Sequence, residues 1–286
     1  TPWGEVRRHR EGEMNAYDRP SRLFDGLEHI RLTIHLIGRS TQQPSLFSTC
    51  YNKWMADERT VLFNKLYFTA TSPLFLKGTL PKLSSCIENS ILNKLLSEQS
   101  MLSNFYSKTD PYKIFYSRKI GYFLQVIDFQ PIVLDGKGQI RPPSEFKELH
   151  FISETYSKLA LCCLNSNLFY WFVTVFSDCR HVNKREVDAF IINLKTLAMK
   201  ELSNQLYKLA VALMNSLKET SINRTMQFKH DILTIQCIYP KTSKKIINEI
   251  DYVLAQHYGF TDEELDFIIN YDIKYRMGRD AGGEEE

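Results

Sequence analysis

Residues 154–177 read ETYSKLALCCLNSNLFYWFVTVFS, and this stretch is the strongest core signal in the chain. Two apolar runs are separated by Asn165, Ser166 and Asn167, whose short polar side chains favour helix caps and turns. We therefore expect two helices that meet at this point. The second run, LFYWFVTVF at 168–176, covers about half of the roughly 18 apolar residues that a membrane helix needs, so it is predicted to be buried inside the protein.

Strands are predicted before this pair of helices. Residues 28–38 alternate apolar and polar side chains with a period of two, which is typical of a strand. Residues 113–134 are rich in β-branched and aromatic residues and end at the turn sequence Asp135-Gly136-Lys137-Gly138, so they predict a hairpin or small antiparallel sheet. A further strand is expected at 148–152, and a helix at 86–99.

Helices dominate the region after this pair. From 194 to 218 the chain has no Gly or Pro, and leucines recur every three or four residues, which predicts one long amphipathic helix. Strand-like residues follow at 228–239. Two final helices are expected at 243–258 and 261–271, because Gly259 suits a left-handed C-cap and Thr261 with Glu264 forms a capping box.

Composition limits the classes of function without selecting one. The 36 Lys and Arg residues nearly balance the 33 Asp and Glu residues, so any surface that binds nucleic acid must come from local clustering. The six cysteines form no Cys-x-x-Cys pair, which argues against a zinc ribbon and for a reducing compartment. No secretory leader or membrane span is expected, and the predicted location is the cytoplasm.

Motifs that would carry catalysis are missing. We find no glycine-rich cofactor turn, P-loop, His-Glu-x-x-His or Gly-x-Ser-x-Gly, and Arg141-Pro142-Pro143-Ser144 lacks the acceptor and aromatic of a methyltransferase loop. Asp135 with Glu145 and Lys147 resembles the acidic and Glu-x-Lys spacing of magnesium-dependent nucleases. The prolines between them disfavour the paired strands that such a site needs, so this alternative is the weaker one.

Two segments concentrate groups that suit nucleic acid. The first basic segment, residues 112–119, mixes aromatic and cationic side chains, and the second basic segment, residues 177–186, follows the bulky apolar run. Cations and short polar side chains on a rigid support can hold phosphates and read base edges. A solvated strand face and a helix-capping loop are the plain alternatives. The predicted DNA contacts are Tyr116, Arg118, Lys119, Arg180, His181, Asn183, Lys184 and Arg185.

A resemblance to a known family rests on four ordered stretches. RKIGYFLQVIDFQP at 118–131, LALCCLNSNLFYWFVTVFSDCRHVNKREV at 159–187 and SKKIINEIDYVLAQHYGFTDEELDFIINYDIKYRMG at 243–278 resemble the C-terminal half of adenine-specific DNA methyltransferases of type IIG-like restriction-modification systems. RPSRLFDGLEHIRLTIHLI at 19–37 resembles the last strands of that family's methyltransferase domain. The matching region of the family is its target-recognition domain.

The resemblance implies an α+β chain of several parts. Residues 1–40 would end a methyltransferase domain, 41–193 form the target-recognition domain, 194–222 a spacer helix, 223–278 a C-terminal strand and helical module, and 279–286 a disordered tail. The partners would be double-stranded DNA and an upstream methyltransferase domain or a separate catalytic subunit. S-adenosylmethionine would bind there, and this chain alone is expected to hold no cofactor or metal and to be inactive.

Two other functions remain open on the sequence alone. The leucines of residues 194–218 suit an intermolecular coiled coil, which would make the chain a protein-interaction module. The acidic residues 135 and 145 with Lys147 would make it a nuclease.

Overall fold

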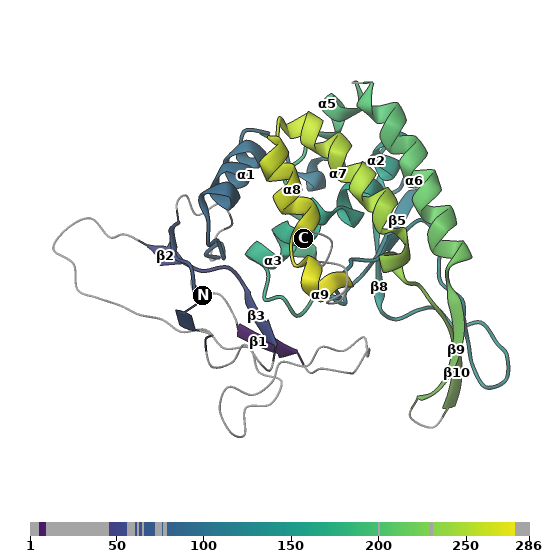
Figure 1. The fold of residues 1–286 in the computed structure, drawn as a ribbon. Coiled ribbons are helices and arrows are strands. Elements are labelled where there is room, and N and C mark those ends of the chain that lie inside the picture. The colour runs from purple at the N-terminus through teal and green to yellow at the C-terminus, as the bar shows by residue number, and fades with distance from the viewer. Residues whose placement is uncertain are drawn as a thin grey trace. The chain divides into compact units, whose positions relative to one another are not determined.

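The structure, a computed structural model, describes residues 6–9, 46–55, 61, 63–64, 66–71, 76, 79–199, 201–228 and 231–277. It mixes helices with small, mainly antiparallel sheets, which confirms the predicted α+β class (Figure 1). The chain divides into two compact units: unit 1 is 1–93 with 173–178, and unit 2 is 94–172 with 179–286. These units divide the chain differently from the predicted domains, whose boundaries stay a prediction.

Unit 1 contains two short strand pairs. Strand β1 (Val6–His9) pairs in parallel with β3 (Asn52–Met55), and β2 (Phe47–Ser48) pairs antiparallel with β4 (Thr69–Ala70). Helix α1 (Cys86–Leu96) follows, as predicted for this region. The buried hydroxyl of Ser48 links strand β2 to two later segments. Its Oγ lies 2.6 Å from Thr71 Oγ1 and donates to the Leu83 carbonyl at 3.1 Å.

A three-stranded antiparallel sheet supports unit 2. Its central strand is β5 (Tyr112–Ser117), flanked by β6 (Val126–Ile127) and β8 (Phe146–Phe151). The first basic segment and the predicted 148–152 strand therefore pair directly, with Tyr116 opposite Lys147. Before this sheet lies the 3₁₀ turn η2 (Leu102–Phe105), whose Leu102 N–H donates to the Phe190 carbonyl at 2.8 Å.

The predicted pair of helices forms the core. Helix α2 (Glu154–Asn165) begins at Ser153, whose side chain accepts a hydrogen bond from the Tyr156 N–H, and α3 (Asn167–Phe176) is buried along its whole length. The two helices are bent by 67° at Ser166. In unit 2, Phe169 and Phe172 each make an edge-on contact with Phe190, at centroid distances of 5.0 and 5.2 Å.

A buried carboxylate fixes the start of α3. Asp251 accepts hydrogen bonds from the backbone N–H groups of Asn167 and Leu168, both at 3.1 Å, and from the Asn167 side chain at 2.6 Å. A negative charge is favourable at a helix N-terminus, where N–H groups have no partner within the helix. Burial nevertheless dominates and raises the pKa of Asp251 to about 6.

The single helix predicted for 194–218 is wrong, because two helices occupy this region. Helix α5 (Leu194–Ala198) ends before α6 (Leu202–Glu219) begins. At about 100° per residue, Leu197 and Leu206 would lie on nearly opposite sides of one continuous helix, yet both are fully buried. The break lets each helix turn its apolar side inward, and α6 packs against α2 and α7.

The C-terminal helices match the sequence prediction closely. Helix α7 (Lys244–Tyr258), which follows the 3₁₀ turn η3 (Pro240–Ser243), ends at Gly259 with φ 68°, the left-handed cap. Helix α8 (Asp262–Asn270) begins at Thr261 with the predicted capping box to Glu264. A short helix α9 (Ile273–Met277) ends the described chain, and its buried Arg276 guanidinium lies 4.3 Å from the Phe123 ring centroid.

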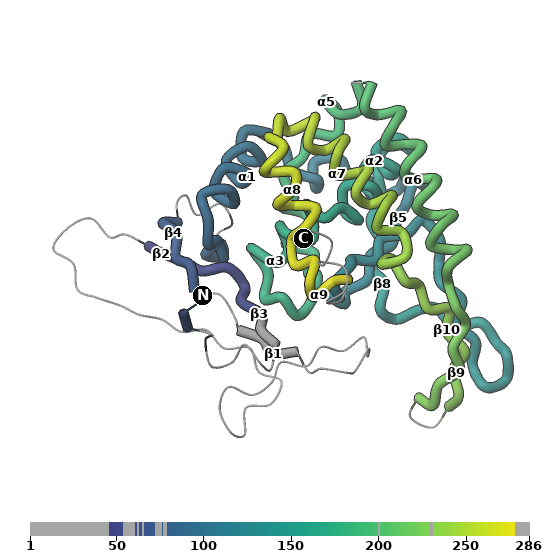
Figure 2. The backbone as a smooth tube through the Cα atoms, viewed as in Figure 1, coloured from purple at the N-terminus to yellow at the C-terminus, as the bar shows by residue number. Residues whose placement is uncertain are grey.

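A second three-stranded sheet, which we call the arm, lies beside these helices. Strand β9 (Ile222–Phe228) pairs with β10 (Asp231–Cys237), and β10 also pairs with β7 (Val133–Leu134). Figure 1 shows the β9–β10 hairpin projecting away from α6 and α7, and the chain path from α6 through the hairpin to α7 can be followed in Figure 2. The sequence predicted a strand at 228–239 but not its partner β9.

Three predictions concern residues outside the ranges that the structure describes. The 28–38 strand, almost all of the 1–40 methyltransferase remnant and the 279–286 tail lie outside the described residues. Within the described residues, no single helix is long and apolar enough to cross a membrane. Helices α2 and α3 together reach that length and composition, but they are sharply bent and their apolar side chains are packed inside the protein.

Candidate nucleic-acid interface

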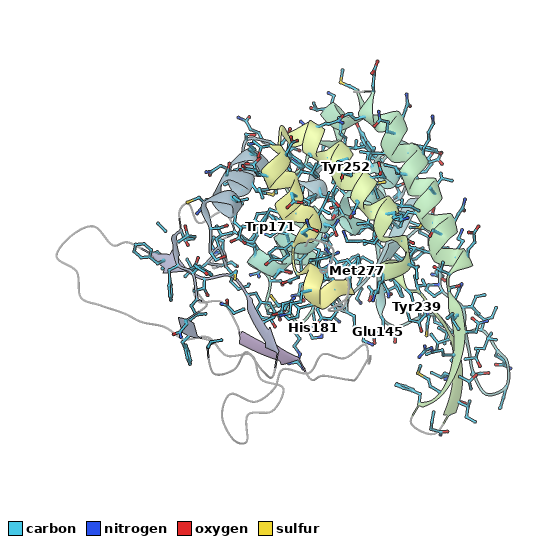
Figure 3. All side chains as sticks on the ribbon, viewed as in Figure 1. Glu145, Trp171, His181, Tyr239, Tyr252 and Met277 are labelled. Carbon is cyan, nitrogen blue, oxygen red and sulfur yellow. The ribbon has the colours of Figure 1, made fainter. Side chains whose placement is uncertain are left out.

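The first basic segment and residues 179–186 of the second, predicted separately, lie side by side in unit 2. Lys119 and His181 form an antiparallel bridge, and the Val182 N–H donates to the Arg118 carbonyl at 2.9 Å. On the other side, the Arg118 N–H donates to the Glu145 carbonyl at 3.0 Å. Residues 118–119 and 180–185, far apart in the sequence, thus form one continuous surface strip. Figure 3 shows Glu145 and His181 at the same end of unit 2.

Burial changes abruptly where the first basic segment reaches this strip. The last four residues of β5, from Ile114 to Ser117, are buried, whereas Arg118 and Lys119 are exposed. Ser117 makes this change sharp, because its hydroxyl accepts a hydrogen bond from the Lys119 N–H at 3.2 Å and bends the chain. The two cations therefore project from the end of a well-anchored strand.

A strained turn begins the second basic segment. Cys179 is buried and has a φ of 55°, in the left-handed region that costs a residue with a side chain about 1–2 kcal/mol. The turn leaves Arg180 exposed and directs His181 to its bridge with Lys119. Packing of the neighbouring core must hold this conformation.

The cations of the strip differ in whether a carboxylate pairs with them. Arg118 makes no ion pair with any residue that the structure describes. Lys184 is bound by Asp188 at 2.6 Å, and Arg185 by the fully buried Glu186 at 2.7 Å. Three of the predicted contacts, Arg118, Lys119 and Arg180, are exposed at the end of the strip where β5 stops.

Tyr116, predicted as a stacking contact, is a core residue instead. Only 4% of its surface is exposed, because β5 turns this side chain into unit 2. Burial raises the pKa of Tyr116, the negative charge of Asp188 adds to the shift, and the hydroxyl stays neutral. The prediction of an exposed aromatic at this position is wrong for this conformation.

Asn183 is the N-cap of helix α4 (Lys184–Asp188), which agrees with the alternative of a helix-capping loop. Its backbone N–H donates to Glu186 Oε2 at 3.2 Å, and the side chain lies near the His181 carbonyl. Half-buried His181 and Asn183 remain at the strip surface beside the exposed cations. Both can offer donors to a ligand, but Asn183 also has a structural role.

Tyr106 is a neighbour that the sequence analysis missed. The Lys184 ammonium lies 5.0 Å from the centroid of the Tyr106 ring, and that ring packs edge-on against Phe151. Burial raises the pKa of Tyr106 far above its ordinary value, and Asp188 raises it further. The spacing of four residues indicates the Lys184–Asp188 ion pair, because such pairs meet on one helix face, but it does not indicate that Tyr106 lies beside them.

The three residues of the nuclease alternative have other roles here. Asp135 accepts hydrogen bonds from the backbone of Lys137 and Gln139 and from the Arg141 side chain. The Gln139 bond is the main cause that lowers the pKa of Asp135. Asp135 thus closes the turn in the arm, while Glu145 and Lys147 lie on the β8 side of the sheet. Among the described residues no three acidic, His or Cys side chains gather to hold a metal ion.

Comparisons of the chain with protein-family models, curated proteins and solved structures found no match.

Proposed function

We propose that this chain recognises a specific DNA sequence, as the target-recognition part of an adenine-specific DNA methyltransferase in a restriction-modification system. The observation that supports DNA recognition most is the bridge between Lys119 and His181, because it joins two basic segments into one strip. The methyltransferase context comes from the ordered sequence resemblance. S-adenosylmethionine and the methyl-transfer residues would then belong to an upstream domain or a separate catalytic subunit.

The strip offers the kinds of contact that a DNA duplex needs. Arg118, Lys119 and Arg180 are exposed cations on neighbouring segments, so they can hold phosphates, and arginine can pair with both acceptors of a guanine edge. His181 and Asn183 add donors of other shapes. The strip rests on buried strand β5 and on the α3–Phe190 packing, which limits its movement. In the complete enzyme, such contacts would offset the cost of flipping the adenine.

The coiled-coil alternative has less support. Leu206, Leu213 and Leu217 of α6 are fully buried, and α6 packs on α2 and α7 of the same chain. Three of the five leucines in its row are therefore already covered, and Leu202 and Leu209 are half-buried.

The test is duplex binding at low salt, measured by fluorescence anisotropy with the chain joined to its upstream domain or mixed with a catalytic partner. Arg118→Ala should weaken binding by about tenfold and reduce the salt dependence by about one counterion. Lys113→Ala is the matched control, because Lys113 is an exposed cation at the other end of β5 that is paired with Glu148. Duplex binding that stays undetectable, or equal losses in the two variants, would contradict the proposal.

A further inference from the structure

Strand β9 is the edge strand of the arm. The strand order is β7-β10-β9, and no strand in the described part of the chain pairs with the outer side of β9. All seven residues of β9 are exposed. A long exposed edge is a template for pairing with another strand, and proteins commonly block such edges with lysine or proline. Strand β9, INRTMQF, contains neither, and Arg224 is its single charged residue.

The hydrogen bonds of β10 show which way the β9 backbone faces. The Gln236 N–H donates to the Ile132 carbonyl at 2.9 Å, so the backbone of Gln236 faces β7. Backbone groups point to opposite sides at successive residues, so Thr234 also faces β7 and does not bond to its opposite residue, Thr225. The two threonine hydroxyls lie 3.0 Å apart, as expected for such a close pair. The N–H and C=O of Thr225 therefore face the outer edge.

Read in reverse about Thr225, β9 keeps the type of side chain at every position except 224 and 226. Counted outward from Thr225, Arg224 corresponds to Met226, whose chain can cover the arginine stem, and Asn223 to Gln227, a pair of amides. At the ends, Ile222 corresponds to Phe228, and each of these apolar residues is 54% exposed. An antiparallel pair of two β9 strands centred on Thr225 would place each residue opposite a compatible one.

We propose that β9 pairs with β9 of a second copy of this chain, antiparallel and about a two-fold axis at Thr225, to make one six-stranded sheet. The two Thr225 residues then exchange two backbone hydrogen bonds, and Ile222 of each copy covers Phe228 of the other. Such a contact is self-complementary and closes after two copies, so it yields a dimer. The Arg224 guanidinium lies 5.6 Å from the Tyr239 ring centroid of its own copy.

The first test is sedimentation equilibrium of the full chain without DNA. We expect a dimer whose dissociation constant rises at least about tenfold in Thr225→Pro, since proline removes two interchain hydrogen bonds and brings its ring to the interface. The ladder to β10 does not use the Thr225 N–H, so far-UV circular dichroism and the melting temperature should stay near those of the unchanged chain.

Charge variants supply a second test, which stands even where the proline variant fails to fold. Thr225→Lys and Thr225→Glu should each weaken the homodimer, while an equal mixture of the two should associate more tightly than either alone. Ile232→Lys is the matched control, because Ile232 is half-exposed on the same face one strand further in, and it should leave the dimer intact.

Three outcomes would overturn the proposal. The chain could stay monomeric at every soluble concentration, or its dimer could be unaffected by all Thr225 variants. If the chain is a monomer and Thr225→Pro weakens its DNA binding, the arm contacts DNA and not a second copy of the chain. Because the dimer is measured without DNA, none of these results decides whether the Lys119–His181 strip binds a duplex.

Discussion

The two basic segments reach the same strip on different supports. The first contains strand β5, and its cations Arg118 and Lys119 follow directly after the buried part of the strand. The second follows helix α3 and includes most of α4. Two buried carboxylates stabilise these helices, Asp251 at the start of α3 and Glu186 within α4. The number of cations in a segment therefore does not tell how many of them are available to a ligand.

This difference assigns different roles to residues of the same type. Removing Arg118 from the first segment should affect DNA binding, because no described carboxylate neutralises it. Removing Lys184 or Arg185 from the second segment should affect stability or local charge balance, because these two cations already pair with Asp188 and Glu186. Four predictions test this division.

The largest effect is expected from reversing the charges of the first segment. Arg118→Glu combined with Lys119→Glu should lower duplex affinity by more than about a hundredfold at low salt, because the variant repels phosphates that the original attracts. Competition anisotropy measures the change. Lys184→Glu, a single reversal on the second segment, should cost much less, and equal losses per charge in the two segments would abolish the distinction between them.

The support of the second segment should also respond to pH. Burial raises the pKa of Asp251 to about 6 from an ordinary 3.8, so the folded state binds this proton more tightly than the unfolded state. The contribution of Asp251 is therefore most favourable below about pH 4 and is lost as the pH rises to about 6, by roughly 1–3 kcal/mol.

Urea unfolding of the unchanged chain and of Asp251→Asn at pH 4 and pH 7 measures this term. The difference between the two proteins should shift between these pH values in favour of the variant at pH 7. A difference that does not change with pH would show that Asp251 titrates as it does in the unfolded chain. The nearby Lys244, whose pKa burial lowers to about 8, titrates above this window.

Arg185 should prove to be a structural cation. Its partner Glu186 is fully buried and accepts from both Arg185 and the Asn183 backbone. Arg185→Ala leaves part of that carboxylate without a partner, so we expect a loss of about 1–3 kcal/mol in the free energy of unfolding. Glu186→Gln added to Arg185→Ala should recover part of the loss. A loss of DNA affinity in Arg185→Ala with unchanged stability would reverse the assignment.

Local signals in the sequence predicted local features well. The capping box at Thr261, the cap at Gly259 and the buried run at 168–176 each depend on residues within a few positions of one another. The break between α5 and α6 was missed, because unbroken helix-forming composition hid a change in the direction of the apolar face. Strand β9 was missed because Arg224 interrupts its apolar positions Ile222, Met226 and Phe228, and because pairing with β10, not burial, forms the strand.

The candidate site could be predicted only in part from the sequence, because contacts between distant segments form it. Both basic segments were predicted, but nothing in either one indicates that Lys119 and His181 form a bridge. Tyr116 was misplaced, because the transition from buried to exposed residues on β5 falls after Ser117 and depends on the neighbouring strands β6 and β8. The ion pairs of Lys184 and Arg185 use residues within four positions, so their spacing could have predicted them.

The smallest effect is expected at the exposed end of the second segment. Asp188→Asn keeps the shape of the side chain but removes the charge that holds Lys184, so the ammonium becomes available to a phosphate. Duplex affinity should rise about two- to fivefold, and its salt dependence should steepen by about one counterion. Lys184→Ala combined with Asp188→Asn should remove the gain. If Lys184→Ala alone lowers affinity as much as Arg118→Ala, the ion pair already opens on DNA, and the two segments bind as equals.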